Sequence, residues 1–202
     1  MSTSIDFWYE FASTYSYPAA MRVEAEAAKR GVSVNWRAFL LGPIFGDQGW
    51  NDSPFNIYPV KGRYMWRDLE RICDSLGLAF KHPAQFPQNG LQGARVATAL
   101  AGAVRADFSR ALYDAQFAKG LIISELETLK GALRAAGQDA EAVLALAGSD
   151  EVKSKLRSET EEAIRLGVFG APSLVTSDGE LFWGNDRLHE ALDWAVKPVG
   201  GK

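Results

Sequence analysis

The sequence has little of what metal sites and disulfide frameworks require. Its 202 residues include one cysteine, Cys73, and two histidines, His82 and His189. A single cysteine can form neither an internal disulfide nor a thiolate cage for a metal ion. We therefore expect no metal site. Cys73 follows Ile72 on an expected helix, and we expect it in the core, since cysteine is among the residues most often buried.

The sequence also lacks an excess of basic residues and any long apolar run. Its 22 Lys and Arg and 25 Asp and Glu give a net charge of −3. No basic field is available to hold a phosphate backbone, so we expect no nucleic-acid partner. No apolar run reaches the about 18 residues of a membrane span, so we expect no membrane partner. Asp6 and Glu10 precede the first basic residue, Arg22, which is unlike a secretory leader, and we expect a cytoplasmic protein.

The first forty residues predict a strand, a helix and a second strand. Residues 5–11 form a short run rich in aromatic side chains, which is typical of a buried strand. Pro18 suits the first turn of a helix that Gly31 ends, and residues 32–38 alternate between apolar and polar. Two strands joined by a helix of about four turns form a right-handed unit with parallel strands.

The middle of the chain predicts one long loop followed by helices. Residues 41–61 are rich in Gly, Pro and Asn, and a loop of that length is uncommon unless it binds something. Ser124 to Glu127 then fits a capping box at the start of a helix. Hydrophobic periodicity predicts the other helices at residues 64–76, 91–104, 107–118, 139–147 and 150–166.

The end of the chain returns to strand patterns. Residues 173–176 and 181–183 are joined by Ser177-Asp178-Gly179, which predicts a hairpin, and residues 187–196 predict a closing helix. Strand–helix–strand, then a helical block, then strand–strand–helix is the order of an α/β fold. We therefore predict a thioredoxin-like core interrupted by an all-helical insertion.

Length and composition are compatible with such an inserted domain. The chain is 47% hydrophobic and 23% charged, which is ordinary for a globular protein, and it is long enough for one core with a large insertion. We assign residues 1–45 and 168–202 to the thioredoxin-like domain and residues 46–167 to the inserted helical domain with a substrate-side loop.

The stretch Ser13-Thr14-Tyr15-Ser16 lies between the first strand and the first helix. Serine and threonine at such a junction commonly cap the helix through their side chains. The same hydroxyls could instead form a reaction centre at the positive end of the helix dipole. The local pattern leaves both interpretations open.

Four motifs, spread in order over almost the whole chain, carry a resemblance to a known family. They are DFWYEFASTYSY, NDSPFNIYPVKGRYMWRDLER, GVFGAPS and FWGNDRL. With them the chain resembles the kappa-class glutathione transferases and especially the 2-hydroxychromene-2-carboxylate isomerases, relatives of the helical-insertion disulfide oxidoreductases. The resemblance implies the thioredoxin-like fold, glutathione as cofactor and a homodimer.

The resemblance also implies a role for Ser13. The redox relatives have C-x-x-C where this chain has Ser13 to Ser16, and a serine has no accessible redox couple, so the reactive sulfur would come from glutathione. Ser13 matches the catalytic serine that contacts the thiol. A donated hydroxyl hydrogen bond and the helix N-terminus would both stabilise the thiolate. The family usually has proline where this chain has Thr14, so Ser13 alone or Ser13 with Thr14 would meet the sulfur.

The remaining glutathione residues follow from the other motifs. Ala171 and Pro172 match the cis-proline loop, where an extended peptide can pair with the backbone. Asn185 and Asp186 match the pair that holds the γ-glutamyl end of glutathione, with Asp186 a helix N-cap in the alternative interpretation. Asn51 and Lys61 resemble the residues that hold the glycyl end.

We expect the second substrate between the long loop and the helical block. Phe45, Trp50 and Phe86 are the predicted substrate-binding residues, forming an apolar slot for a flat aromatic acid. In the alternative interpretation these aromatics form satellite core. The sequence does not choose between three possible partners for the substrate carboxylate: Arg37, Lys61 and His82.

The resemblance implies a glutathione-dependent isomerase of aromatic hydrocarbon catabolism, such as naphthalene degradation. Its substrate would be a small aromatic 2-oxo or 2-hydroxy acid, interconverted between 2-hydroxychromene-2-carboxylate and trans-o-hydroxybenzylidenepyruvate types by reversible thiolate addition. The alternative is a kappa-type glutathione transferase that conjugates small electrophiles. A non-catalytic binding module is a third possibility.

Overall fold

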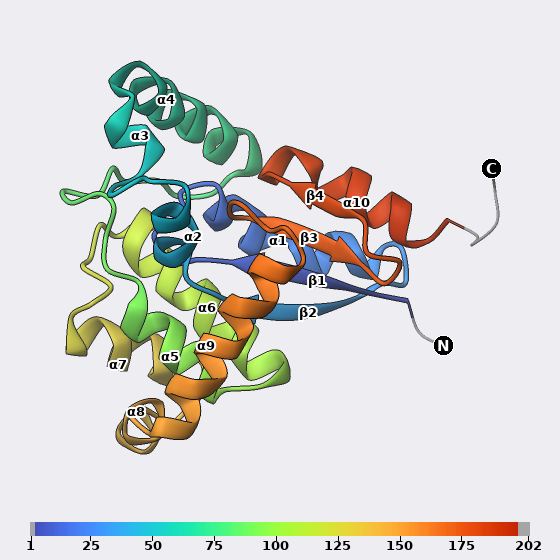
Figure 1. The fold of residues 1–202 in the computed structure, drawn as a ribbon. Coiled ribbons are helices and arrows are strands. Elements are labelled where there is room, and N and C mark those ends of the chain that lie inside the picture. Colours follow the sequence, from blue (N-terminus) through green and yellow to red (C-terminus); the bar gives the residue numbers. More distant parts are fainter. Residues whose placement is uncertain (1–2, 198–202) are drawn as a thin grey trace.

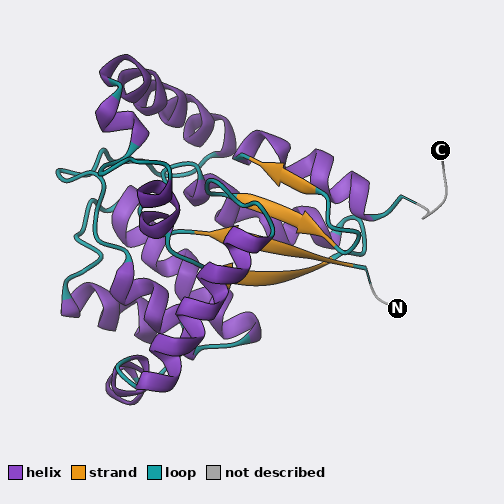
Figure 2. Cartoon of the chain, in the orientation of Figure 1, coloured by secondary structure: helices purple, strands orange, loops and turns teal. Residues whose placement is uncertain are grey.

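A computed structural model describes residues 3–197, and a four-stranded mixed sheet lies at its centre (Figures 1 and 2). The spatial order is β2-β1-β3-β4. β1 runs parallel to β2, with Ser4 opposite Ser33, and antiparallel to β3, with Ile5 opposite Thr176. The strands are β1 (Ser4–Tyr9), β2 (Ser33–Ala38), β3 (Ser173–Thr176) and β4 (Leu181–Trp183). This confirms the predicted split sheet.

Most of the chain between β2 and β3 is helical. Figure 1 shows α3 and α4 on one side of the molecule, and α5 to α8 gathered at the end of the sheet near β2. The helices are α1 (Ser16–Ala28), α2 (Leu41–Asp47), α3 (Pro54–Ile57), α4 (Pro59–Leu76), α5 (Leu91–Ala99), α6 (Gly102–Tyr113), a π-helical turn (Asp114–Ala118), α7 (Leu126–Ala135), α8 (Ala140–Ala147), α9 (Asp150–Arg165), a 3-10 turn (Asn185–Arg187) and α10 (Leu188–Ala195).

β1 is buried on both faces, which explains its aromatic sequence. Phe7 and Tyr9 point into the main core with side chains of α1, α6 and α10. Trp8 points the opposite way, into a second core with Ala163 of α9 and Val175 of β3. Alternate residues of a strand face opposite sides, so a central strand covered twice needs large apolar residues at consecutive positions.

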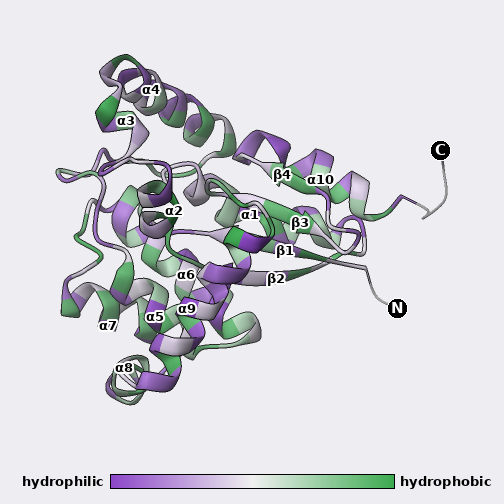
Figure 3. Cartoon of the chain, in the orientation of Figure 1, coloured by the Kyte–Doolittle hydropathy of each residue, from purple (hydrophilic) through white to green (hydrophobic). Residues whose placement is uncertain are grey.

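The outer helices are amphipathic, as their periodicity predicted. The buried residues of α9 are Val152, Leu156, Thr160 and Ala163, at the three- and four-residue spacing of one helix face. Figure 3 shows hydrophilic and hydrophobic residues interleaved along α4 and α9. Each of these helices therefore packs by one side only.

The predicted long loop at residues 41–61 is wrong. The segment folds into α2, α3 and the first residues of α4. Pro54 and Pro59 each lie in the first turn of a helix, where the missing N–H costs no hydrogen bond, and the Ser53 hydroxyl accepts from the Phe55 N–H at 3.3 Å. The prolines that suggested a loop therefore start helices. The predicted domain boundary at residue 45 lies inside α2, and the division into two domains stays a prediction.

Two other helix predictions need correction. The expected helix at residues 91–104 is interrupted, because Leu100 and Ala101 are extended and Gly102 has a positive φ of 54°. The expected capping box at residues 124–127 is also wrong. α7 begins at Leu126, and the Glu125 side chain at the N-cap accepts no hydrogen bond from the helix.

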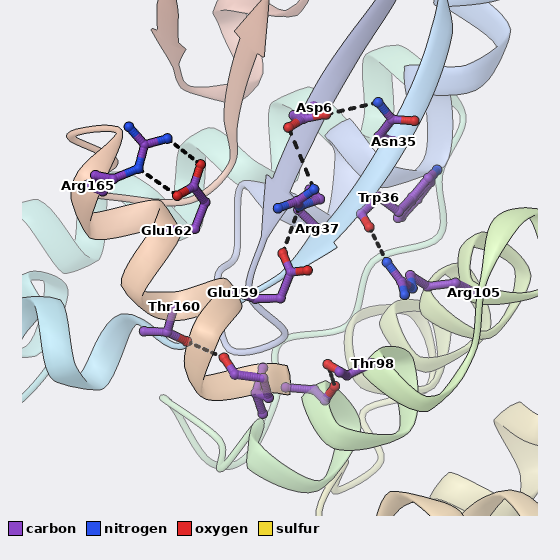
Figure 4. Close-up of polar contacts among 12 residues, drawn as sticks. Asp6, Asn35, Trp36, Arg37, Thr98, Arg105, Glu159, Thr160, Glu162 and Arg165 are labelled. Carbon is purple, nitrogen blue, oxygen red and sulfur yellow. Dashed lines mark hydrogen bonds and ion pairs between the residues drawn. The ribbon is translucent and has the colours of Figure 1, made fainter. Parts of the chain in front are cut away.

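Arg105 holds the α5–α6 junction to the sheet, as Figure 4 shows for its contact with β2. Its Nε and one terminal nitrogen donate to the Leu100 carbonyl at 2.9 and 2.7 Å, and the other terminal nitrogen donates to the Trp36 carbonyl at 2.7 Å. One guanidinium therefore donates both to a carbonyl of the extended linker and to a carbonyl of the edge strand β2.

Replacing Arg105 with methionine should lower the free energy of unfolding by about 2 kcal/mol, because two carbonyls lose charged donors. Urea denaturation measures the change. Arg134→Met, at an exposed position on α7, is the matched control and should change stability by less than about 0.5 kcal/mol. An equal effect in the two variants would show that the Arg105 hydrogen bonds do not stabilise the junction.

We expected neither a metal site nor a membrane partner, and residues 3–197 bear on both expectations. Within that range no cluster of His, Cys, Asp and Glu side chains has the arrangement of a metal site. None of the helices described is both long and apolar enough to cross a lipid bilayer.

Candidate functional site

One large cavity of about 1440 Å³ lies at the N-terminal end of α1. Its walls come from the turn before α1, from α2 and α3 with the start of α4, from the segment around Phe86, and from the loops that precede β3 and α10. The cavity therefore lies where the two halves of the thioredoxin-like core meet the inserted helices.

The predicted site residues meet at this cavity although they come from distant parts of the chain. The lining includes every one of them except Pro172, which is buried behind Ala171. Their roles stay predictions. The lining residues that the sequence singled out are Ser13, Phe45, Trp50, Asn51, Lys61, Phe86, Ala171, Asn185 and Asp186.

Ser13 supplies the accessible hydroxyl of the turn before α1. Its Oγ donates to the Ala171 carbonyl at 2.8 Å. The Thr14 hydroxyl is buried and donates to the Met65 sulfur at 3.1 Å. α1 begins at Ser16 after Tyr15 at the N-cap, and no side chain caps it. The helix-capping interpretation of these hydroxyls is therefore wrong.

The loop before β3 has the expected cis peptide bond between Ala171 and Pro172. It is held by the Ser173 hydroxyl, which donates to the Gly170 carbonyl at 2.8 Å. Gly170 is packed so closely on Trp183 that an added Cβ would lie 2.4 Å from the indole nitrogen. A second cis bond, between residues 86 and 87, was not predicted.

Asn185 and Asp186 have different environments at the start of α10. Asn185 is buried, and one terminal nitrogen of Arg22 donates to its carbonyl at 2.7 Å and to its side-chain oxygen at 2.9 Å. Asp186 is exposed at the cavity, 3.7 Å from the Arg187 guanidinium. Its side chain forms no cap hydrogen bond at the 3-10 turn. Arg22 and Arg187 were not predicted, because an arginine is usually just a surface residue.

Of the three possible partners for a substrate carboxylate, Arg37, Lys61 and His82, the residue that lines the cavity is Lys61. Its ammonium lies 4.8 Å from the centre of the Tyr58 ring and lines the cavity. Arg37 instead lies on the sheet, 2.7 Å from Glu159 of α9, as Figure 4 shows. His82 packs on Trp66 with ring centres 3.8 Å apart. Neither Arg37 nor His82 lines the cavity.

The predicted substrate-binding aromatics are half-buried cavity residues. The rings of Phe45 and Trp50 lie 5.5 Å apart, and Phe86 lies edge-on to Trp66 at 5.0 Å. All three predicted residues keep one side toward the cavity. Their partial exposure is unlike that of the aromatics in β1, which are fully buried.

Glu10 is a buried cavity residue that sequence reasoning also missed. It follows β1 directly, is only 7% exposed, and lines the cavity beside Ala12 and Ser13. Burial raises the pKa of the Glu10 carboxyl to about 7, although hydrogen bonds from the N–H groups of Ala12 and Ser13 lower it in part. A carboxylate within the aromatic run FWYEF was the signal that could have revealed it.

Comparison with known proteins identifies the fold. Residues 4–193 match the model of the DSBA-like thioredoxin domain. The chain belongs to this family. The solved structure of a 2-hydroxychromene-2-carboxylate isomerase superposes with a TM-score of 0.84 at 26% identity, and the match covers 96% of this chain and 94% of that one.

Two curated relatives match almost the whole chain. The 2-hydroxychromene-2-carboxylate isomerase of Sphingobium xenophagum is 30% identical, over 93% of this chain and 95% of its own. Glutathione S-transferase kappa 2 of Caenorhabditis elegans is 26% identical, over 98% of this chain and 93% of its own. The resemblance expected from the four motifs is confirmed, and by these names the relatives are enzymes.

This DSBA-like domain has no dithiol at the start of its first helix. Cys73, the single cysteine, lies in the core on α4, as predicted, and does not line the cavity. Burial raises the pKa of its thiol to about 11, so it is not a thiolate at neutral pH. The side chains of the chain itself therefore cannot exchange a disulfide at this site.

Proposed function

We propose that the protein is a glutathione-dependent isomerase of the 2-hydroxychromene-2-carboxylate type. The observation that carries the proposal is the Ser13 hydroxyl, which donates to the Ala171 carbonyl in the cavity wall, in the turn before α1 where a redox relative would supply its own cysteine. The names of the relatives support both the reaction and the cofactor.

The residues of the cavity fit a tripeptide thiol. Glutathione carries two carboxylates and an ammonium, and the lining includes the cations of Lys61 and Arg187 and the carboxylate of Asp186. Asn51 and Lys61 would hold the glycyl end, and Asn185 and Asp186 the γ-glutamyl end. The backbone of Ala171, before cis-Pro172, would pair with the middle of the peptide.

The volume of the cavity leaves room for a second molecule. About 1440 Å³ exceeds the ~300–1,000 Å³ of a site for one drug-sized ligand. Phe45, Trp50 and Phe86 supply flat apolar surface for an aromatic acid. An isomerase with a thiol cofactor needs both molecules in contact.

The residues of the chain act by positioning and by electrostatics. Glutathione, held by Asn51, Lys61, Asn185 and Asp186, would supply a thiolate for reversible addition to a conjugated double bond. Ser13 turns its hydroxyl from Ala171 to donate to the sulfur, and the N-terminus of α1 adds a partial positive charge. The aromatic lining would orient a flat substrate and exclude water.

A titration with glutathione tests the proposal. The ultraviolet difference spectrum of the thiolate should appear at neutral pH on binding, and the protein should then convert the cis-type substrate into the trans product. The kappa relative supports a second candidate, a transferase, which would retain the adduct. Mass spectrometry of the products separates the two, and a lack of any glutathione affinity would favour a binding module.

Asp186→Asn should weaken glutathione binding about 10-fold, because the ammonium would lose a charged partner worth about 1.5 kcal/mol. Calorimetric titration measures the dissociation constant. Glu190→Gln is the matched control, since Glu190 also pairs with Arg187, at 3.1 Å, but lies outside the cavity lining. The same loss of affinity in both variants would show that Asp186 does not bind the ammonium of glutathione.

We extend the proposal to the assembly and the location of the enzyme, which we take to be a homodimer in the cytoplasm that takes part in aromatic hydrocarbon catabolism. Apolar side chains at the start of α4 and just before it are exposed, among them Tyr58, Val60 and Tyr64. A partner subunit would remove such surface from water. Light scattering coupled to size-exclusion chromatography measures the mass.

A further inference from the structure

A thiol that binds at neutral pH and becomes a thiolate must give its proton to a base. A free thiol has a pKa of about 8.5, so most of it is protonated before it binds. Ser13 cannot be this base, because a hydroxyl that stabilises a thiolate donates its own proton to the sulfur. Neither histidine lines the cavity. The base is therefore solvent or a carboxylate.

Four carboxylates line the cavity, and three of them already have side-chain partners. Asp52 accepts from Asn56, Asp68 accepts from Tyr15 and pairs with Arg71, and Asp186 lies beside Arg187. Each of these three carboxylates therefore already faces a hydrogen-bond donor or a cation. Glu10 is the remaining one, and it forms no ion pair with any residue of the range 3–197.

The turn after β1 carries the Glu10 carboxyl and the Ser13 hydroxyl together. The Ala12 N–H donates to Oε2 of Glu10 at 2.9 Å, and the Ser13 N–H donates to its main-chain carbonyl at 3.0 Å. The other carboxyl oxygen, Oε1, lies against Gly90, where an added Cβ would be only 2.6 Å away. Gly90 also lines the cavity, and because it has no side chain the Glu10 carboxyl has room beside it in the cavity wall.

The groups around Glu10 favour its neutral form. Burial is the largest effect and raises the pKa of the carboxyl to about 7. The N–H groups of Ala12 and Ser13 oppose it, and from α6 the neutral Tyr113 hydroxyl donates to the Glu10 carbonyl at 2.9 Å. A thiolate in the same cavity would add a second negative charge and raise the pKa of Glu10 further.

We propose that Glu10 is the base that accepts the thiol proton when glutathione binds. The inference rests on the proposed function. The S–H bond breaks with its electron pair left on sulfur, and an O–H bond forms on the Glu10 carboxylate. The cavity then holds one negative charge before and after the transfer, so ionisation of the thiol does not place two anions side by side in a poorly solvated site.

Proton counting tests this role without measuring turnover. Glutathione is titrated into the protein at pH 7.5 in two buffers of different ionisation enthalpy, and the ultraviolet band counts the thiolate formed. For wild type we expect release of about 0.2 proton per thiolate, since a carboxyl with a pKa of about 7 is mostly ionised at this pH and takes up the proton. For Glu10→Gln we expect about 0.9, because the proton must enter the buffer.

Two further variants make the result specific. Gly90→Ala places a methyl group against Oε1 and should move proton release toward the Glu10→Gln value. Asp52→Asn removes another carboxylate of the same cavity and should match wild type. Circular dichroism confirms that each variant is folded.

The possible outcomes separate the two proposals. Equal release of about 0.9 proton by wild type and Glu10→Gln would overturn the role of Glu10 while leaving glutathione dependence in place. A Glu10→Gln protein that binds glutathione without forming thiolate would overturn it as well, since the carboxyl would then act by some means other than accepting the proton. No thiolate in wild type would instead defeat the proposed function itself.

Discussion

Ser13→Ala should lower kcat/KM for the isomerisation about 100- to 1,000-fold. This is the usual effect of removing one preorganised hydrogen-bond donor to an anion, which here would be the thiolate. The hydroxyl is the accessible donor of the turn before α1, and its present acceptor is the Ala171 carbonyl, 2.8 Å away in the same cavity wall. Without it the bound thiol should ionise at a higher pH. Steady-state kinetics and the thiolate band as a function of pH measure the two effects.

Thr14→Val is the matched control for this variant. It removes the neighbouring hydroxyl, which is buried and donates to the Met65 sulfur. We expect kcat/KM to change less than about threefold, because the Thr14 side chain is only 1% exposed and its hydroxyl is directed at Met65, away from the Ala171 carbonyl. A large loss in Thr14→Val with none in Ser13→Ala would show that Thr14, and not Ser13, donates to the thiolate.

Glu10→Gln should make the protein more stable than wild type at pH 8, by up to about 3 kcal/mol, and equally stable near pH 4. The carboxyl has an ordinary pKa of 4.5 in the unfolded chain and a pKa of about 7 when folded, and one pKa unit is worth about 1.4 kcal/mol. As the pH rises from 4.5 to 7, the unfolded chain loses this proton first, so wild type loses stability over that window. Glutamine has the shape of the neutral acid and no charge to bury.

Urea denaturation of both proteins at several pH values measures this difference. Other groups titrate alike in both proteins. Among them are Asp178 and Asp193, whose pKa values are lowered in the folded protein, so their protonation costs stability only as the pH falls into the acid range. Subtracting one protein from the other isolates Glu10. A difference that does not change with pH would show that the folded carboxyl titrates like a free one.

The strands and the closing helix were predictable because their signals are local. The aromatic run of β1, the alternation of β2 and the Ser177-Asp178-Gly179 turn each decide a conformation within a few residues. The interruption after α5 was not, because Leu100 and Ala101 have no helix-breaking sequence. They are extended where the Leu100 carbonyl meets the Arg105 guanidinium, a contact that also involves β2.

The site was predictable to the extent that motifs mark it. Four collinear motifs pointed to Ser13, Ala171 and Asn185, and these three residues line one cavity. Motifs say nothing about residues whose importance comes only from their surroundings. Glu10 is such a residue, since the same glutamate on a surface would titrate normally.

The amino-acid sequence by itself determined the order of the elements, the family, and the absence of a dithiol at the first helix, because these depend on residue types and on short-range patterns. Only the tertiary structure decided which hydroxyl faces the cavity, which cation is available there, and that one carboxyl is buried without a counter-ion. Burial and distance between residues far apart in the chain set these properties, and neither quantity exists until the two halves of the core close around the inserted helices.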